Sequence, residues 1–150
     1  FRGVKLHQCC DRFTFRSRRF ARAARWAADR NLPMFVHVES RDEARMLVRY
    51  ASRHPENRII AAHLLALATY MRSSFTCRNV WFDISPPQTT SVARLRRAVA
   101  HFGAGMIVLG TDVPYGRGNL GINLRRVREL PLGREEKELI LGGNMSSLLG

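Results

Sequence analysis

The sequence predicts an α/β fold in which a parallel β-sheet is built from five consecutive strand–helix units. Five short apolar runs are spaced along the chain, and stretches with helical periodicity separate them. No low-complexity linker interrupts this alternation. Alternating strands and helices at this spacing favour a parallel sheet with right-handed crossovers. With 150 residues, we expect one domain over residues 1–150 with a substantial core.

The predicted strands are nearly continuous apolar runs, which is typical of parallel strands covered on both faces. Pro86 and Pro87 close the fourth run, and a Gly103–Gly105 turn precedes the fifth. Five such strands fit an open sheet or part of a barrel, and the periodicity does not choose between them. The predicted strands are 3–7, 34–38, 59–63, 79–85 and 106–110.

The predicted helices carry apolar residues on one face and arginines on the other. Segment 17–30 places Phe20, Ala23, Ala24 and Ala27 together, and it ends before Pro33, which biases Leu32 away from helical geometry. The other predicted helices are 41–53, 64–75, 91–102, 122–130, 134–141 and a last short one starting at Asn144.

The net charge of +13 comes almost entirely from arginine, since Lys5 and Lys137 are the only lysines. The arginines recur with helical spacing, which indicates solvated helix faces. A protein that binds single-stranded nucleic acid would interleave aromatic residues with the basic ones. Here the aromatic residues lie in the apolar runs instead. We therefore do not expect nucleic acid as a partner; a basic nucleic-acid binder is the alternative, which a steep salt dependence of DNA binding would support.

The cysteines and the absence of long apolar runs indicate a reduced, cytoplasmic setting. Cys9, Cys10 and Cys77 are odd in number and form no C-x-x-C pair. No run approaches the roughly 20 apolar residues that cross a bilayer, so we expect no membrane partner. FRGVKLHQCC also does not form a signal peptide.

Polar residues stand where the predicted strands end. Because the carboxyl ends of parallel strands meet at one edge, these side chains are expected to converge. Neutral imidazole and carboxylate suit zinc and similar ions, and a carboxylate can accept a proton from metal-activated water. In the fourth strand, Asp83 and Ser85 share a face, so either could be its polar contribution. The converging residues are Lys5, His7, His37, His63 and Asp112.

Other motifs are given structural interpretations. Residues 116–121 match G-x-G-x-x-G, but helices and not a second strand with an acidic residue are predicted to follow, which argues against a dinucleotide site. His54 and His101 lie in a turn and at a helix end, where we expect structural roles. No G-x-S-x-G motif supports a serine hydrolase.

The motifs GVKLH, LPMFVHV, RIIAAH, NVWFDIS, MIVLGTDVPYG and ILGGNMSSLLG, in this order, resemble the later part of the amidohydrolase superfamily. The similarity runs over the whole chain and is nearest to the amidohydrolase-related branch of metal-dependent hydrolases and decarboxylases. It implies that the five strands correspond to strands 4–8 of a (β/α)8 TIM barrel. The family's first strand, which carries a His-x-His metal motif, has no counterpart. We therefore expect either a fragment lacking the N-terminal part of the barrel or a protein lacking half of the usual metal site.

The resemblance also implies roles for individual residues. His37 would be a metal ligand, and Asp112 would bind the metal and take a proton from its water. His63 would be a second ligand in binuclear members, or would orient water or substrate in mononuclear ones. Lys5 stands where some members carry a carboxylated lysine and others an unmodified one, and His7 and Ser85 would contact substrate.

These observations predict an enzyme: a metal-dependent hydrolase, most simply with Zn²⁺, acting on a C–N or C–O bond of a small molecule through metal-activated water. A decarboxylase of the same branch is one alternative. A deoxyribonuclease of the superfamily would suit the charge, but such enzymes tend to carry Glu where Lys5 stands. The non-enzymatic alternative is a chain without the His-x-His strand that is catalytically incompetent, whose open sheet edges would favour a homo-oligomer.

Overall fold

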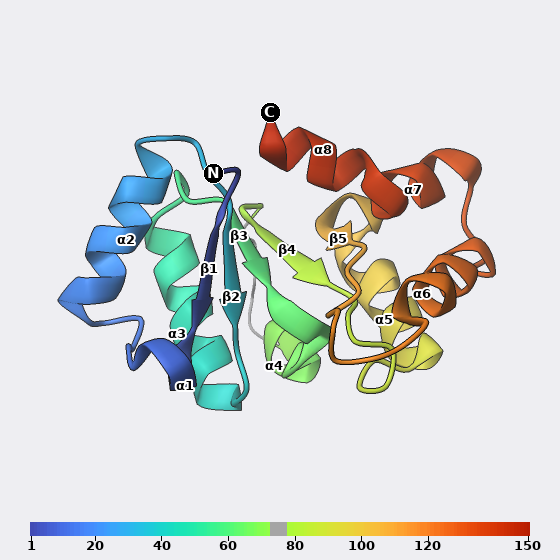
Figure 1. The fold of residues 1–150 in the computed structure, drawn as a ribbon, viewed down its shortest axis with the longest axis horizontal. Coiled ribbons are helices and arrows are strands. Elements are labelled where there is room, and N and C mark those ends of the chain that lie inside the picture. The colour runs from blue at the N-terminus through green and yellow to red at the C-terminus, as the bar shows by residue number, and fades with distance from the viewer. Residues whose placement is uncertain (73–77) are drawn as a thin grey trace.

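A five-stranded parallel sheet forms the centre of the protein, as predicted. The computed structural model describes residues 1–72 and 78–150. The strands lie in chain order, β1-β2-β3-β4-β5, and every neighbouring pair is parallel (Figure 1). Their bounds are β1 Val4–His7, β2 Met34–His37, β3 Ile59–Ala61, β4 Val80–Asp83 and β5 Ile107–Val108.

Helices follow the strands, and serine side chains start three of them. The Ser17 hydroxyl caps α2, and Ser40 and Glu43 form a capping box at the start of α3, which has the predicted bounds. Ser91 caps α5 in the same way. The helices up to β5 are α1 Gln8–Asp11, α2 Arg18–Ala28, α3 Arg41–Arg53, η1 Ala62–Leu64, α4 Leu67–Arg72, α5 Val92–Phe102 and η2 Ala104–Met106.

The third unit differs from the prediction. The strand ends at Ala61 and not at His63, because His63 turns into the left-handed region with φ 68° inside the short η1 turn. The helix predicted over 64–75 begins later, at Leu67. Its last predicted residues, and Cys77, lie outside the described part of the chain. The predicted strands at 79–85 and 106–110 are also shortened, to β4 and β5.

The C-terminal third is helical. It contains α6 Asn119–Arg128, α7 Arg134–Glu138, the π-turn η3 Leu139–Gly143 and α8 Asn144–Leu149. The helix predicted at 122–130 thus begins three residues earlier, within the glycine-rich motif, and no strand follows it among the residues described. The dinucleotide interpretation therefore lacks its second strand, as expected.

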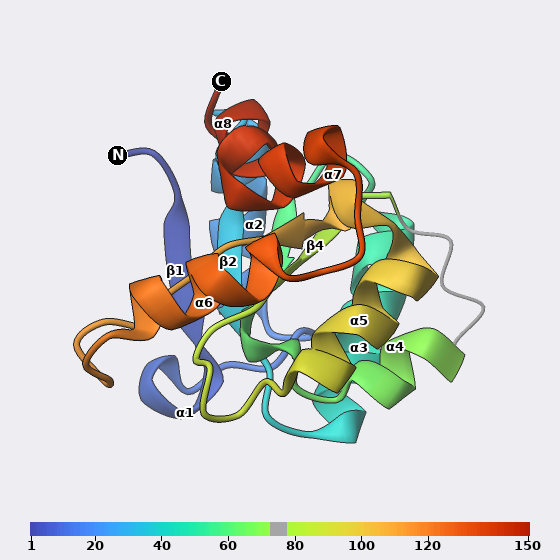
Figure 2. The same ribbon diagram turned by 90° about the vertical axis from the view of Figure 1, so that its right-hand side faces the viewer.

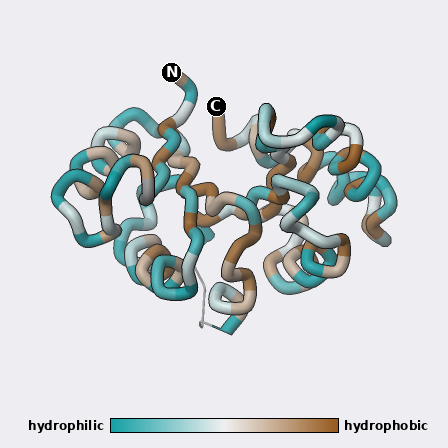
Figure 3. The backbone as a smooth tube through the Cα atoms, turned by 60° about the horizontal axis from the view of Figure 1, so that its bottom comes forward, coloured by the Kyte–Doolittle hydropathy of each residue, from teal (hydrophilic) through white to brown (hydrophobic). Residues whose placement is uncertain are grey.

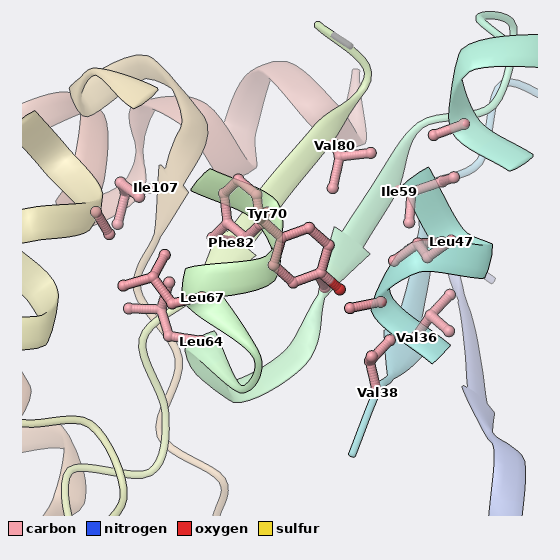
Figure 4. Packing of buried hydrophobic residues seen from close by; sticks show 14 of the residues in the cluster. Val36, Val38, Leu47, Ile59, Leu64, Leu67, Tyr70, Val80, Phe82 and Ile107 are labelled. Atoms are coloured by element: carbon pink, nitrogen blue, oxygen red, sulfur yellow. The ribbon is translucent and has the colours of Figure 1, made fainter. Parts of the chain in front are cut away.

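The main core packs one face of the sheet against the helices α2 to α5, and it extends to buried residues of η2, α6 and η3. Val36, Ala61 and Phe82 are in register across three strands, and all are buried. Phe82 meets Tyr70 of α4 edge-on, with ring centroids 5.1 Å apart (Figure 4). Hydrophobic segments, coloured brown, run through the centre of the molecule, whereas hydrophilic segments, coloured teal, recur along the outer helices (Figure 3). This arrangement agrees with the predicted arginine-bearing helix faces.

The opposite face of the sheet carries a smaller apolar cluster under α8. Ile60, Val108 and Leu148 are buried together, with Phe35 and Trp81 packed against them. Asn144 attaches α8 to η2 and β5, because its side-chain amide donates hydrogen bonds to the carbonyls of Ala104 and Ile107 at 2.8 and 2.7 Å. The chain termini lie at the same end of the molecule (Figures 1 and 2). The carboxyl ends of the strands therefore point to the other end.

Other expectations can be placed on this fold. His54 contacts Glu56 at 3.0 Å and stacks on Tyr50, and His101 meets the edge of Phe102, so both make local packing contacts. Cys10 is exposed and free. Within the described ranges, no helix is both long and apolar enough to cross a membrane.

Candidate metal centre

Two histidines face each other where β1 and β2 end. His7 and His37 are register partners, so they project to the same face of the sheet. Their rings are stacked, with centroids 4.0 Å apart and an interplanar angle of 16°. Two residues after His37, Glu39 places a carboxylate oxygen 3.2 Å from the His37 Nε2 atom.

His7, His37 and Glu39 form a group able to hold a cation. One donor atom of each residue lies within 4.8 Å of the others. Donors about 2.1 Å from one ion are at most about 4.2 Å apart, so a small closure would be required. Stacked rings also direct their in-plane lone pairs in parallel, so one ring would have to turn. The donor chemistry fits a divalent ion, and the buried His7 Nδ1 atom has no hydrogen-bond partner among the described residues.

His37 is held in the form that binds metals. Burial lowers its pKa to about 4, and the nearby positive charges of His7, His63 and Lys5 act in the same direction, against the opposing charge of Glu39. At neutral pH the imidazole is therefore uncharged, with a nitrogen lone pair available to a cation.

His63 joins this group from the η1 turn. Its ring meets that of His37 edge-on, with centroids 4.8 Å apart. Its Nδ1 atom lies 2.8 Å from the Ser85 carbonyl oxygen and 3.2 Å from the Ser85 hydroxyl. It also lies 3.4 Å from an Asp83 carboxylate oxygen. The side chain is thus fixed from one side by the end of β4.

Asp83 is a fully buried carboxylate beneath His63. It accepts hydrogen bonds from the His63 backbone amide at 3.2 Å, from the Ser85 amide at 3.2 Å and from the Ser85 hydroxyl at 2.5 Å. Burial alone would lower the pKa of His63, but the hydrogen bond and charge of Asp83, the Ser85 carbonyl and the charge of Asp112 together raise it.

Gly110 borders this carboxylate closely. A Cβ atom added at Gly110 would lie 1.9 Å from an Asp83 oxygen and 3.2 Å from the Ser85 hydroxyl. The glycine of the GTD motif is therefore required by space, because any larger residue would displace the buried carboxylate.

Lys5 and Asp112 are coupled to the same edge electrostatically. Burial lowers the pKa of Lys5, while the charges of Asp83 and Asp112 oppose this. The Lys5 ammonium lies 4.2 Å above the ring of Phe35, its register partner. Asp112 follows β5 in the left-handed region at φ 55°.

The structure thus brings His7, His37 and His63 into ring contact, and it places Ser85 against His63. Lys5 and Asp112 are linked to them through charge. Sequence reasoning missed Glu39 and left Asp83 open against Ser85. The spacing His-x-Glu was an available signal for Glu39, since alternate residues of an extended segment share a face.

Comparisons with known proteins identify the family of this chain and the fold that it shares. A family model described as amidohydrolase matches residues 1–150. A search of curated proteins gave no match. The 5-carboxyvanillate decarboxylase of Sphingomonas paucimobilis has a similar structure, with a TM-score of 0.80 and 15% identity over 99% of this chain and 58% of that chain.

Two further solved structures show the same likeness. A zinc-bound amidohydrolase from Burkholderia multivorans has a TM-score of 0.74 and 17% identity over 90% of this chain and 58% of its own. The 4-oxalomesaconate hydratase of Rhodopseudomonas palustris has a TM-score of 0.75 and 13% identity over 99% of this chain and 56% of its own. This chain therefore spans little more than half the length of these structures, and its parallel sheet corresponds to part of a TIM barrel. By the family match over its whole length, the chain belongs to the amidohydrolase family.

Proposed function

We propose that the protein is a metal-dependent hydrolase of the amidohydrolase type, acting on a C–N or C–O bond of a small molecule. The observation that carries the proposal is the neutral His37 imidazole, in contact with two further imidazoles and a carboxylate at the carboxyl edge of the sheet. Family membership adds support, since one similar structure is an amidohydrolase with bound zinc.

The residues divide into binding and proton-moving groups. His37 would hold the ion, together with Asp112 and, through its Nε2 atom, His63. His7 and Glu39 are a second donor set that shares His37. A divalent ion bound here would lower the pKa of a bound water to about 7. The Asp112 carboxylate would accept the proton, and Lys5, His7 and Ser85 would contact substrate.

Zinc titration of the purified protein tests the binding part. We expect one Zn²⁺ per chain by calorimetry, with binding lost in His37→Asn and weakened at least about tenfold in Asp112→Asn. Glu39→Gln distinguishes the two donor sets, because it weakens binding only if Glu39 is a ligand. His101→Asn, a histidine away from the strand ends, is the control. Unchanged zinc affinity in His37→Asn would overturn the proposal.

Activity tests the reaction. The zinc-loaded protein should hydrolyse members of a panel of small amides, esters and lactones, and Asp112→Asn should abolish this. Full activity in Asp112→Asn would refute the assigned role.

A decarboxylase is the second candidate, because two of the similar structures are decarboxylases, one acting on 5-carboxyvanillate and one bound to 2,6-dihydroxybenzoate. In this case the ion would hold a substrate carboxylate. Release of carbon dioxide from carboxylated phenols, without hydrolysis of the amide and ester panel, would favour this reaction.

A further inference from the structure

We propose that Asp83 is a positioning residue that, through Ser85, fixes His63 as the tautomer protonated on Nδ1, so that Nε2 alone serves the reaction site. The inference deepens the proposed function and rests on it, since it assumes that His63 acts at the metal centre. It concerns how the protein prepares this side chain before any ligand is bound.

The His63 ring has a direct partner at its Nδ1 atom. The nearest atom to His63 Nδ1 is the Ser85 carbonyl oxygen, at 2.8 Å. A carbonyl oxygen only accepts hydrogen bonds, so Nδ1 must carry the hydrogen in this contact. The Asp83 oxygen 3.4 Å away is also an acceptor and favours the same hydrogen position. In the neutral ring, the lone pair then lies on Nε2.

Asp83 holds the Ser85 carbonyl in place. Ser85 is buried and is bound to Asp83 twice, through its backbone amide and through its hydroxyl. Asp83 also accepts a hydrogen bond from the backbone amide of His63 itself. One carboxylate therefore fixes both the acceptor and the backbone that carries the ring, although His63 sits in a strained left-handed conformation.

The Asp83 carboxylate is itself closely confined. Asp83 has no exposed surface, and Gly110 lies so close that the carboxylate has no room to turn toward β5. A buried charge with all these hydrogen bonds is costly to rearrange. In the other tautomer, Nδ1 would carry no hydrogen. Its lone pair would then face these two oxygen acceptors, and the contact would be repulsive. The network therefore selects one tautomer, on the order of tenfold or more over the other.

The tautomer can be measured directly. In ¹⁵N-labelled full chain without metal, at about pH 9 and thus well above the ordinary imidazole pKa of about 6.5, a long-range ¹H–¹⁵N correlation distinguishes the protonated from the bare ring nitrogen. We expect wild-type His63 to be protonated on Nδ1. In Asp83→Asn, where a donor replaces an acceptor, the population should move at least about fivefold toward the Nε2–H form.

Two further variants keep the test decisive. Asp42→Asn removes the same charge from an exposed residue of α3 that pairs with Arg45, and it should leave the His63 tautomer unchanged. Ser85→Ala removes only the hydroxyl, and it should shift the tautomer in the same direction as Asp83→Asn; if Asp83→Asn fails to fold, Ser85→Ala decides. A general loss of stability would lower the melting temperature without altering the tautomer of the folded protein.

The inference is overturned if wild-type His63 is protonated on Nε2, or if neither Asp83→Asn nor Ser85→Ala changes the tautomer. The measurement uses no metal and no substrate. Its failure is therefore distinct from a failure to bind zinc, which would remove the proposed function and leave the tautomer result standing.

Discussion

Replacing Gly110 by alanine should disrupt the buried end of β4 although no charged residue is itself substituted. The new methyl carbon would lie 1.9 Å from an Asp83 oxygen and 2.9 Å from the carboxylate carbon, far inside van der Waals contact. Overpacking of this kind costs about 1–3 kcal/mol, and displacing hydrogen bonds to a buried charge adds about 1.5–3 kcal/mol. We therefore expect a loss of roughly 3–6 kcal/mol in the free energy of unfolding.

Urea denaturation followed by circular dichroism measures this loss, and a thermal scan should show the melting temperature lowered by at least about 6 °C. Gly121→Ala is the matched control. Gly121 lies within α6, where an added Cβ meets nothing within 4 Å, so alanine should stabilise the protein by about 0.5–1 kcal/mol. If Gly110→Ala were within about 0.5 kcal/mol of wild type, the close packing around Asp83 would be disproved.

Three further results are expected. Asn144→Ala leaves the carbonyls of Ala104 and Ile107 without their donor and should lower the free energy of urea unfolding by about 2–4 kcal/mol. Substitution of the exposed Ser146 by alanine should cost little, and equal costs would contradict the role of Asn144 in attaching α8. By NMR, His37 should titrate near pH 4, and a midpoint near pH 6.5 would refute the assigned environment. Because His37 of the unfolded chain takes up its proton near pH 6.5, the contribution of His37 to stability should fall as the pH drops from 6.5 to 4. The losses of unfolding free energy in Tyr50→Phe and Asn57→Ala should be non-additive, since the Tyr50 hydroxyl donates to the Asn57 side chain at 2.6 Å. A coupling energy near zero in a double-mutant cycle would show that this bond contributes nothing.

Much of the sheet follows from patterns that are local in the sequence. The apolar runs predicted as strands over 3–7 and 34–38 become β1 and β2 to within one residue at each end, because their pattern is continuous and bounded by turn residues. The third run continued in apolar residues beyond Ala61, so its pattern gave no sign of the turn. The break at His63 depends on Asp83, twenty positions away, which binds the amide of His63 and stabilises its left-handed backbone. Such a contact is not visible in a local pattern.

The candidate site shows the same division. Convergence at the carboxyl edge follows from parallel topology alone, and the structure brings the three histidines at 7, 37 and 63 into ring contact. The choice between Asp83 and Ser85 could not be made from alternation, since both face the same way. The structure shows that they act together, one as a buried acceptor and the other as its donor. Side-chain distances of this kind depend on register and burial, which the sequence does not state.

The pairing of β1 with β2 has a consequence for how this protein tolerates change. His7 stands opposite His37 only because Val4 pairs with Met34, and a slip of one residue would turn one imidazole toward the helices and away from its partner. An insertion or deletion within either strand would therefore separate the two nitrogen donors while leaving every ligand type in the chain. Length changes between residues 12 and 17, outside both strands, would leave this alignment intact. If the proposed cation binds here, the spacing of backbone hydrogen bonds would itself help to determine its affinity.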